Sequence, residues 1–216
     1  MTPISPDSVW AVVLAAGTSS RLGQPKQLLD LGGEPILNHV LRAAAMSRLG
    51  GTVLVLGHQA EAIGAAVGDF GQIPVVNRDY AAGQSTSLRA GIAALPGTAT
   101  GAVVLLGDQP LVTAGQIDQL IDRFVALGQA DRFIQTRYGE VPAPPVLIGR
   151  HWFPEVETIS GDQGARELMR SHPDRIEAVT SDDDRPLDID TVDDYRALLG
   201  RVSEMRSTGG PGNPTS

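Results

Sequence analysis

Residues 9–26 read VWAVVLAAGTSSRLGQPK, an apolar run followed at once by a loop of small and basic residues. A short apolar run that ends at a turn is typical of a strand buried on both faces of a sheet. Three further runs of this kind lie at residues 52–56, 73–76 and 102–106. Apolar residues at helical spacing fill the intervals, at residues 35–49, 59–67, 85–95 and 113–127. This alternation predicts an α/β fold with a doubly wound, mostly parallel sheet.

The second half of the chain has shorter and less regular patterns. Strand-like segments lie at residues 132–136, 145–148 and 175–179, and helical ones at residues 163–170 and 191–199. Neither a repeat of fixed period nor a linker rich in Gly and Pro separates the halves, so we expect both to share one sheet. The predicted organisation is a flexible N-terminus over residues 1–8, a single domain over residues 9–201 and a disordered tail over residues 202–216.

The composition is that of a globular protein, with 42% hydrophobic, 19% charged and 4% aromatic residues among 216. The formal net charge of −8 argues against a broad surface for nucleic acid or anionic membrane, because such surfaces need an excess of Lys and Arg. The absence of cysteine excludes disulfides, thiolate metal ligands and cysteine nucleophiles. No signal segment or membrane-spanning apolar run is present, so we expect a cytoplasmic protein that binds neither nucleic acid nor membrane.

The loop after the first strand has the features of an anion site. Its small residues leave backbone N–H groups exposed to wrap a phosphate chain, and Arg21 and Lys26 supply positive charge. It is not a P-loop, because Gly-Gln-Pro stands at residues 23–25 where that motif needs Gly-Lys-Ser/Thr, and no Gly-x-Gly-x-x-Gly dinucleotide fingerprint follows the strand. The loop therefore indicates a triphosphate site of another kind, with an ordinary surface turn as the alternative.

Acidic residues follow at two places. Asp108 comes directly after the strand at residues 102–106, at the carboxyl edge where open α/β sheets bind ligands, and is a candidate ligand of a metal ion. Asp188 and Asp190 precede the last helix, and alternation along an extended segment puts them on one side. Carboxylates suit Mg²⁺. A structural role is the alternative for this segment, because Thr191 and Asp194 have the spacing of a capping box.

The run Leu14–Lys26 resembles the Leu-Ala-Ala-Gly-x-Ser-x-Arg-x-Gly-x-Pro-Lys signature of the MobA-like nucleotidyltransferases. Within that superfamily, further segments are similar to the molybdenum cofactor cytidylyltransferase branch, at residues 77–88, 107–110, 145–149, 161–166 and 188–191. The resemblance covers nearly the whole chain up to the tail. It implies a Rossmann-like nucleotidyltransferase fold in one MobA-like domain over residues 9–201.

The resemblance also implies roles for individual residues. Lys26, Arg21 and Asp108 are expected to be catalytic. Asp108 and Asp190 are expected to hold Mg²⁺, with Asp188 as the weaker candidate. The residues expected to contact the nucleotide are Leu14, Ala15, Ala16, Gly17, Arg21, Lys26, Gln84, Ser85, Ser87 and Asp108.

The activity implied is transfer of CMP from CTP to the terminal phosphate of the molybdenum (molybdopterin) cofactor, with release of pyrophosphate. Ala16 favours CTP over GTP, because the guanylyl-transferring relatives commonly have glycine there. The partners implied are CTP or another NTP, a molybdopterin-type cofactor, and a molybdoenzyme or its maturation factor. One departure, at residues 143–145, leaves room for a different acceptor, because Ala-Pro-Pro stands where relatives often carry a small polar residue or His.

Three alternatives remain open. A sugar-1-phosphate or other small-molecule nucleotidyltransferase would use the same nucleotide half with another acceptor. An NAD(P)-dependent oxidoreductase acting on a pigment is disfavoured by the missing dinucleotide fingerprint. A non-catalytic carrier of the molybdenum cofactor is disfavoured by Asp108 and Lys26, since storage alone does not need both.

Overall fold

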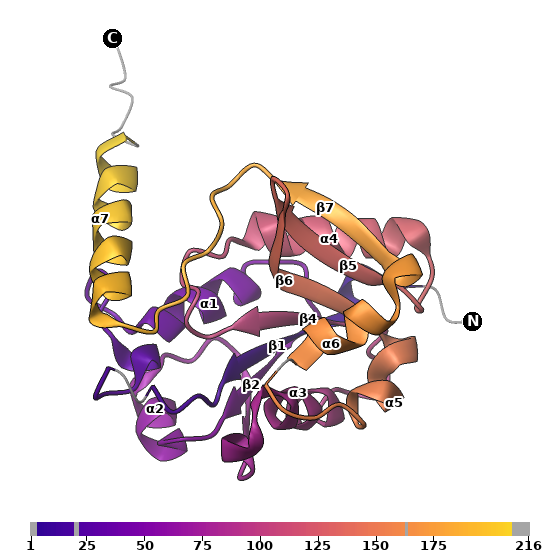
Figure 1. Cartoon of the computed structure of the whole chain (residues 1–216), viewed down its shortest axis with the longest axis horizontal. Coiled ribbons are helices and arrows are strands. Elements are labelled where there is room, and N and C mark those ends of the chain that lie inside the picture. Colours follow the sequence, from indigo (N-terminus) through magenta and orange to yellow (C-terminus); the bar gives the residue numbers. More distant parts are fainter. Residues whose placement is uncertain (1–3, 20–21, 163, 209–216) are drawn as a thin grey trace.

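The computed structural model describes residues 4–19, 22–162 and 164–208. Within these residues the chain forms a seven-stranded sheet in the order β3-β2-β1-β4-β6-β5-β7 (Figure 1). The strands are β1 (Val9–Ala15), β2 (Thr52–Leu56), β3 (Ile73–Val76), β4 (Gly101–Leu106), β5 (Phe133–Tyr138), β6 (Val141–Gly149) and β7 (Ile176–Ser181). Both halves of the chain therefore contribute to one sheet.

The direction of the strands confirms the predicted fold class. β1 pairs in parallel with β2 and β4, β2 with β3, and β5 with β7, whereas β6 runs antiparallel to β4 and β5. The first four strands thus place their carboxyl ends along one edge of the sheet, where a doubly wound fold binds its ligand.

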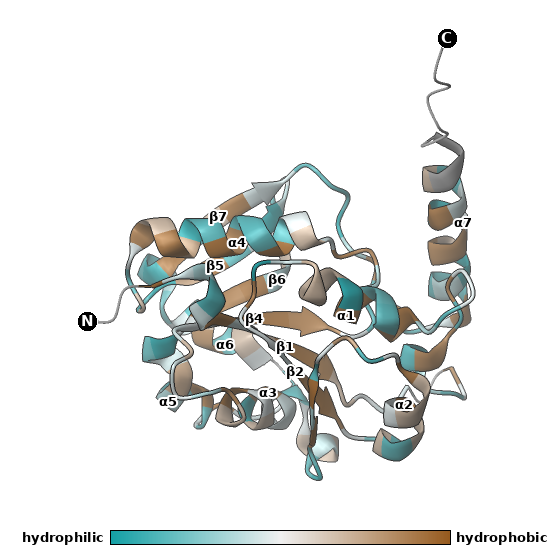
Figure 2. Cartoon of the chain, turned by 180° about the vertical axis from the view of Figure 1, so that it is seen from behind, coloured by the Kyte–Doolittle hydropathy of each residue, from teal (hydrophilic) through white to brown (hydrophobic). Residues whose placement is uncertain are grey.

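Helices cover both faces of the sheet. Their bounds are α1 (Ile36–Ala45), α2 (Ala60–Ala66), α3 (Gln84–Ala93), α4 (Ala114–Leu127), α5 (Phe153–Val156), α6 (Gly164–Ser171) and α7 (Val192–Thr208). α1 and α4 lie on one face, and α3, α5 and α6 on the other (Figure 1). Figure 2 shows hydrophobic strands at the centre and hydrophilic stretches on the helices around them, as a two-sided core requires.

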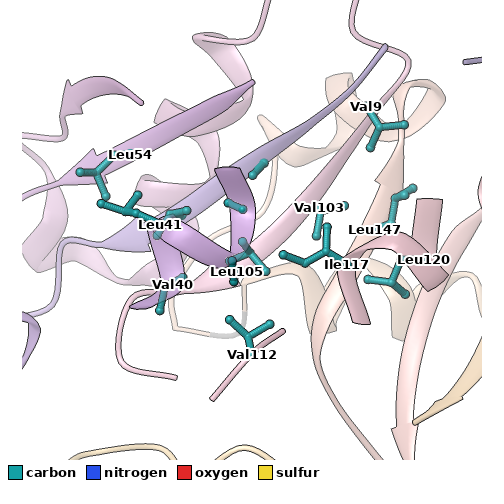
Figure 3. Packing of buried hydrophobic residues seen from close by; sticks show 14 of the residues in the cluster. Val9, Val40, Leu41, Leu54, Val103, Leu105, Val112, Ile117, Leu120 and Leu147 are labelled. Atoms are coloured by element: carbon teal, nitrogen blue, oxygen red, sulfur yellow. The ribbon is translucent and has the colours of Figure 1, made fainter. Parts of the chain in front are cut away.

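Successive side chains along each strand point to opposite faces of the sheet and so contribute to two separate hydrophobic cores. Ala11 and Val13 of β1 pack with α1 and α4, whereas Val12 packs on the opposite face with α3. The first core is shown in Figure 3, where Leu41 of α1 and Ile117 of α4 meet strand residues such as Leu105. These side chains are at most 1% exposed, so this face of the sheet is a closed aliphatic layer.

One strand departs from the expected burial. Residues 73–76 were predicted to be buried on both faces, but in β3 Ile73 and Val76 are 46% and 57% exposed. The reason is topological, because β3 is an edge strand and pairs only with β2. Pro74 suits such a position, since proline cannot donate a hydrogen bond to a further strand.

The ends of the domain also differ from the prediction. Residues 202–208, expected in a disordered tail, belong to α7, whose Val202 packs beside Leu198 on a small apolar cluster. At the other end the Ser8 and Thr100 hydroxyl oxygens lie 2.6 Å apart in a hydrogen bond, and Ile4 packs on the first core. The folded part therefore extends beyond residues 9–201. Residues 1–3 and 209–216 of the two expected flexible ends lie outside the described residues.

Within the described part of the chain, none of the helices combines the length and the apolar character that crossing a bilayer requires.

Candidate active site

A cleft of about 330 Å³ opens at the carboxyl edge of the sheet, between the loop after β1, the end of β4 and the start of α3. The predicted nucleotide-contacting residues that line it are Leu14, Ala16, Gly17, Lys26, Gln84, Ser87 and Asp108. Ala15 and Ser85 are 1% exposed and lie behind this lining, and Arg21 lies outside the described residues. The sequence therefore named residues that the fold gathers from three separate segments.

Lys26 is the only lysine of the chain, and it connects Asp108 in the cleft with Asp190 in the segment before α7. Its ammonium forms an ion pair with Asp108 and donates to Asp190 Oδ1 at 2.9 Å. Its backbone N–H donates to Ser19 Oγ at 3.0 Å, which fixes the end of the loop to its start. One cation thus joins the loop after β1, the end of β4 and the segment before α7.

Burial and neighbouring charges shift the pKa values of Asp108 and Lys26. Burial raises the pKa of Asp108, the Lys26 ammonium acts in the opposite direction, and the nearby Asp188 carboxylate raises it further. Burial lowers the pKa of Lys26, but the two carboxylates that it contacts outweigh burial, and the net pKa is raised. The ionised form of the buried Asp108 carboxylate is therefore stabilised by the Lys26 ammonium beside it.

The segment before α7 caps that helix, and its two aspartates contact residues elsewhere in the fold. The Thr191 hydroxyl accepts from Asp194 N at 3.2 Å while the Asp194 carboxylate accepts from Thr191 N at 2.8 Å, so the predicted capping box is present. Asp190 instead reaches Lys26, and Asp188 accepts from Gln109 Nε2 at 2.7 Å. Asp188 and Asp190 do not line the cleft themselves, and they contact it through Gln109 and Lys26.

The donor set fits a hard divalent cation. Asp108 and Asp190 contact the same ammonium, so their oxygens lie within reach of a single small cation. Among the described residues no cluster of three or more His, Cys, Asp or Glu side chains could hold a metal ion. Mg²⁺ is usually bound by one or two carboxylates together with substrate phosphates, which matches a pair of aspartates beside a phosphate-binding loop.

The sequence profile of the MobA-like NTP transferase domain matches residues 11–176, which include the loop, Lys26 and Asp108. The chain belongs to this family. The expectation of a nucleotidyltransferase is confirmed at the level of this MobA-like family, and the nucleotide and the acceptor stay predictions.

Relatives of this MobA-like protein extend over nearly its whole length. The structure of the Mycobacterium tuberculosis Rv0371c homologue from Mycobacterium sp. strain JC1 has a TM-score of 0.83 at 34% identity and covers 93% of this chain and 99% of that one. The manganese complex of Rv0371c from Mycobacterium tuberculosis H37Rv has a TM-score of 0.75 at 34% identity and covers 89% and 98%. Nicotine blue oxidoreductase of Paenarthrobacter nicotinovorans is 31% identical over 201 residues, which are 88% of this chain and 96% of the relative.

The wall opposite Lys26 in this MobA-like cleft is shaped by close backbone contacts. Gly83, with φ of +112°, approaches Gly161 so closely that a Cβ would lie 2.5 Å from the Gly161 carbonyl oxygen. The carbonyl of Gly161 accepts from Ser85 N at 3.0 Å. Asn77 Nδ2 donates to the Thr86 and Ser87 hydroxyls at 2.8 and 3.0 Å and orients the first turn of α3. These contacts fix the segment that carries Gln84 and Ser87.

Several cleft residues were not identified from the sequence. Tyr80 and Asp162 line the cleft, and Gln27 lines it while donating to the Ala15 carbonyl oxygen at 3.2 Å. Gln109 lies beside the cleft and holds Asp188. Adjacency to Lys26 and Asp108 could have pointed to Gln27 and Gln109. Tyr80 and Asp162 lie within the similar segments at residues 77–88 and 161–166, but nothing in those segments distinguished them from their neighbours.

Proposed function

We propose that this protein transfers CMP from CTP to the terminal phosphate of the molybdenum cofactor, with release of pyrophosphate. The observation that carries the proposal is the contact of the Lys26 ammonium with both Asp108 and Asp190, at a cleft that is also lined by the end of β1 and by Ala16, Gly17 and Thr18 of the loop after it. This arrangement of one ammonium, two carboxylates and a small-residue loop supports binding of a triphosphate with a divalent cation.

The reaction needs positioning and charge neutralisation more than proton removal. An acceptor phosphate is anionic near neutral pH, so one of its oxygens can attack the α-phosphorus of CTP while the bond to the leaving pyrophosphate breaks. Exposed backbone N–H groups of the loop around Gly17 would hold the phosphate chain. Lys26 would offset the negative charge that accumulates on the departing pyrophosphate, and we assign the same role to Arg21 from the resemblance.

Asp108 and Asp190 are the residues that would hold the divalent cation, with Asp188 beside them. When bound, Mg²⁺ or Mn²⁺ neutralises phosphate charge and acts as a Lewis acid. The manganese complex of the related Rv0371c supports a divalent metal in this family. We propose Mg²⁺ for this protein because hard oxygen donors match it.

The choice of nucleotide and acceptor is supported by similarity to the molybdenum cofactor cytidylyltransferase branch at residues 77–88, 107–110 and 161–166, and by Ala16 in the loop. A molybdoenzyme or its maturation factor in the cytoplasm would receive the product. One relative is named an oxidoreductase, so hydride transfer from NAD(P)H is measured in parallel. Transfer to a sugar 1-phosphate is the closest alternative reaction.

Pyrophosphate release tests the proposal. Purified protein is supplied with Mg²⁺ and each of CTP, GTP, ATP and UTP, with and without molybdenum cofactor. We expect release that requires CTP and the cofactor together and that Asp108→Asn abolishes.

Asp122→Asn is the matched control, because Asp122 lies on α4 and pairs with Arg48 at 2.8 Å, away from the cleft lining. Release with a sugar 1-phosphate in place of the cofactor, or reduction of a pigment by NAD(P)H without any release, would replace the proposal with the corresponding alternative.

A further inference from the structure

Gln109 lies immediately after Asp108 and is 4% exposed. Its backbone is held on both sides, because its N–H donates to the Leu106 carbonyl at 3.2 Å and its own carbonyl accepts from Val112 N at 3.2 Å. Its side chain is turned to a distant part of the chain, where Nε2 donates to Asp188 Oδ1 at 2.7 Å. The turn at residues 106–112 thus holds the Gln109 amide where it can donate to the segment that carries Asp188 and Asp190.

That segment, residues 182–191, connects the end of β7 to the start of α7 without helix or strand (Figure 1). We call it the acidic strap. Its early part is held away from the cleft, where Asp183 accepts from Gln116 Nε2 at 2.8 Å and Asp184 pairs with Arg201 at 2.7 Å. Its later part is held by Ile189, which is fully buried, and by the contacts of the two aspartates beside it.

Asp188 and Asp190 flank Ile189 and point to the same side, because Ile189 is buried while both aspartates are exposed. Asp190 meets Lys26 and Asp188 meets Gln109. Among the described residues, Gln109 is the only side chain that donates to Asp188. A neutral amide leaves the charge of Asp188 intact and uses one of its two oxygens.

We infer that Gln109 is a positioning residue that holds the acidic strap to the end of β4 and thereby sets the place of Asp190 relative to Asp108. The inference rests on the proposed function, because it concerns the residues assigned to the metal. Side chains that orient metal ligands from outside the coordination sphere typically change metal affinity by about 10- to 100-fold when removed. Gln109 follows the assigned ligand Asp108 in the chain. It also holds Asp188, which lies two residues before the assigned ligand Asp190.

Binding of Mn²⁺ alone, followed by loss of the free-ion electron paramagnetic resonance signal, tests the inference without turnover. Gln109→Leu keeps the approximate size and removes the donor, and we expect its Mn²⁺ affinity to fall about tenfold. Arg201→Ala is the matched control, because it releases the same strap at Asp184, away from the cleft. We expect the Mn²⁺ affinity of the control to stay within about twofold of the wild type, because the Asp184 carboxylate is 80% exposed and such ion pairs contribute little. Equal weakening by both variants would show a general loosening of the strap and overturn the assignment.

A double-mutant cycle identifies the partner through which Gln109 acts. If the effect passes through Asp188, Gln109→Leu causes no further loss of Mn²⁺ affinity in an Asp188→Ala background. Losses that multiply across the two variants would contradict this.

Hydrogen exchange in metal-free protein separates the inference from the proposed function. Gln109→Leu should speed exchange of backbone amides at residues 187–191 and leave those of β4 unchanged. Absence of Mn²⁺ binding by the wild type would refute the metal site, whereas unchanged exchange in a folded Gln109→Leu variant would refute the positioning role.

Discussion

Replacing the single lysine tests whether the cation of the cleft serves the reaction rather than the fold. Lys26→Met removes the ammonium that contacts Asp108 and Asp190 and keeps the aliphatic stem. We expect turnover to fall by about 100- to 1000-fold, or roughly 2.7–4 kcal/mol, the effect of removing one preorganised charge-stabilising donor.

The free energy of unfolding should fall by less. Removing one partner of a fully buried ion pair costs about 3–5 kcal/mol, and an exposed pair contributes about 0.2–1 kcal/mol. The Lys26 and Asp108 side chains are 15% and 13% exposed, so the pair lies between these limits. Asp108 can also take up a proton once the ammonium is gone, because burial raises its pKa. We therefore expect a loss of about 1–2 kcal/mol.

Both quantities are measured on the same preparations, turnover as pyrophosphate release at saturating CTP and stability by urea unfolding. Arg48→Met is the control, since Arg48 pairs with Asp118 and Asp122 outside the cleft and should leave turnover unchanged and stability close to that of the wild type. If Lys26→Met raises the activation free energy by no more than it lowers the free energy of unfolding, the catalytic role of Lys26 is wrong.

Three shorter predictions address the contact between Gly57 and Tyr80, the pKa of Lys26 and the packing of the first core. Gly57→Ala places a Cβ 2.7 Å from the Cβ of Tyr80, which lines the cleft, so we expect KM for CTP to rise about tenfold, or roughly 1.4 kcal/mol, with a smaller change in kcat; an unchanged KM would mean that Tyr80 does not contact the nucleotide. In NMR of lysine-labelled protein the single Lys26 signal should titrate above the ordinary pKa of 10.5 and shift back towards it in Asp108→Asn. This ion pair stabilises the fold below pH 10.5 and stops doing so as the pH rises through the folded pKa, so a wild-type pKa below 10.5 would contradict it. Leu105→Ala, at a 1% exposed site of the first core (Figure 3), should lower the free energy of unfolding by about 2–5 kcal/mol in urea, and a loss below about 1 kcal/mol would show that the core closes around the gap.

The parallel half of the fold could be read from the sequence because each of its strands is a continuous apolar run between turns. β2 and β3 have the predicted bounds, β1 ends one residue after the apolar run at residues 9–14, and β4 begins one residue before its predicted start at residue 102. What the runs do not encode is the order of strands, so the edge position of β3 and its exposed side chains were missed.

The second half was harder for local reasons. β6 begins at Val141, upstream of the predicted segment 145–148. The first part of this strand was not predicted because it contains three prolines, and proline usually argues against a strand. α5, Phe153–Val156, is too short to show a period. α7 continues past residue 201 because Val202 packs on an apolar cluster that includes Leu198 and, from a distant part of the chain, Leu29 and Ile36.

The sequence could name Lys26, Asp108 and Asp190 as candidate site residues, but it could not predict that Lys26 contacts both aspartates. Asp190 is 164 residues from Lys26 in the chain, and only the crossing of the acidic strap brings them to 2.9 Å. Gln109 illustrates the same limit, because a buried amide next to a candidate ligand has no distinguishing pattern until its partner Asp188 is known.

The most direct test of the central claim follows the nucleotide itself. The protein is incubated with Mg²⁺, molybdenum cofactor and CTP labelled at the α-phosphate, and the products are separated and weighed by mass spectrometry. The account predicts that the label moves to the cofactor as a CMP adduct, in equal amount to the pyrophosphate released, and that Asp108→Asn gives none. Label found only in CTP or in free CMP, with active cofactor and folded protein, would contradict it.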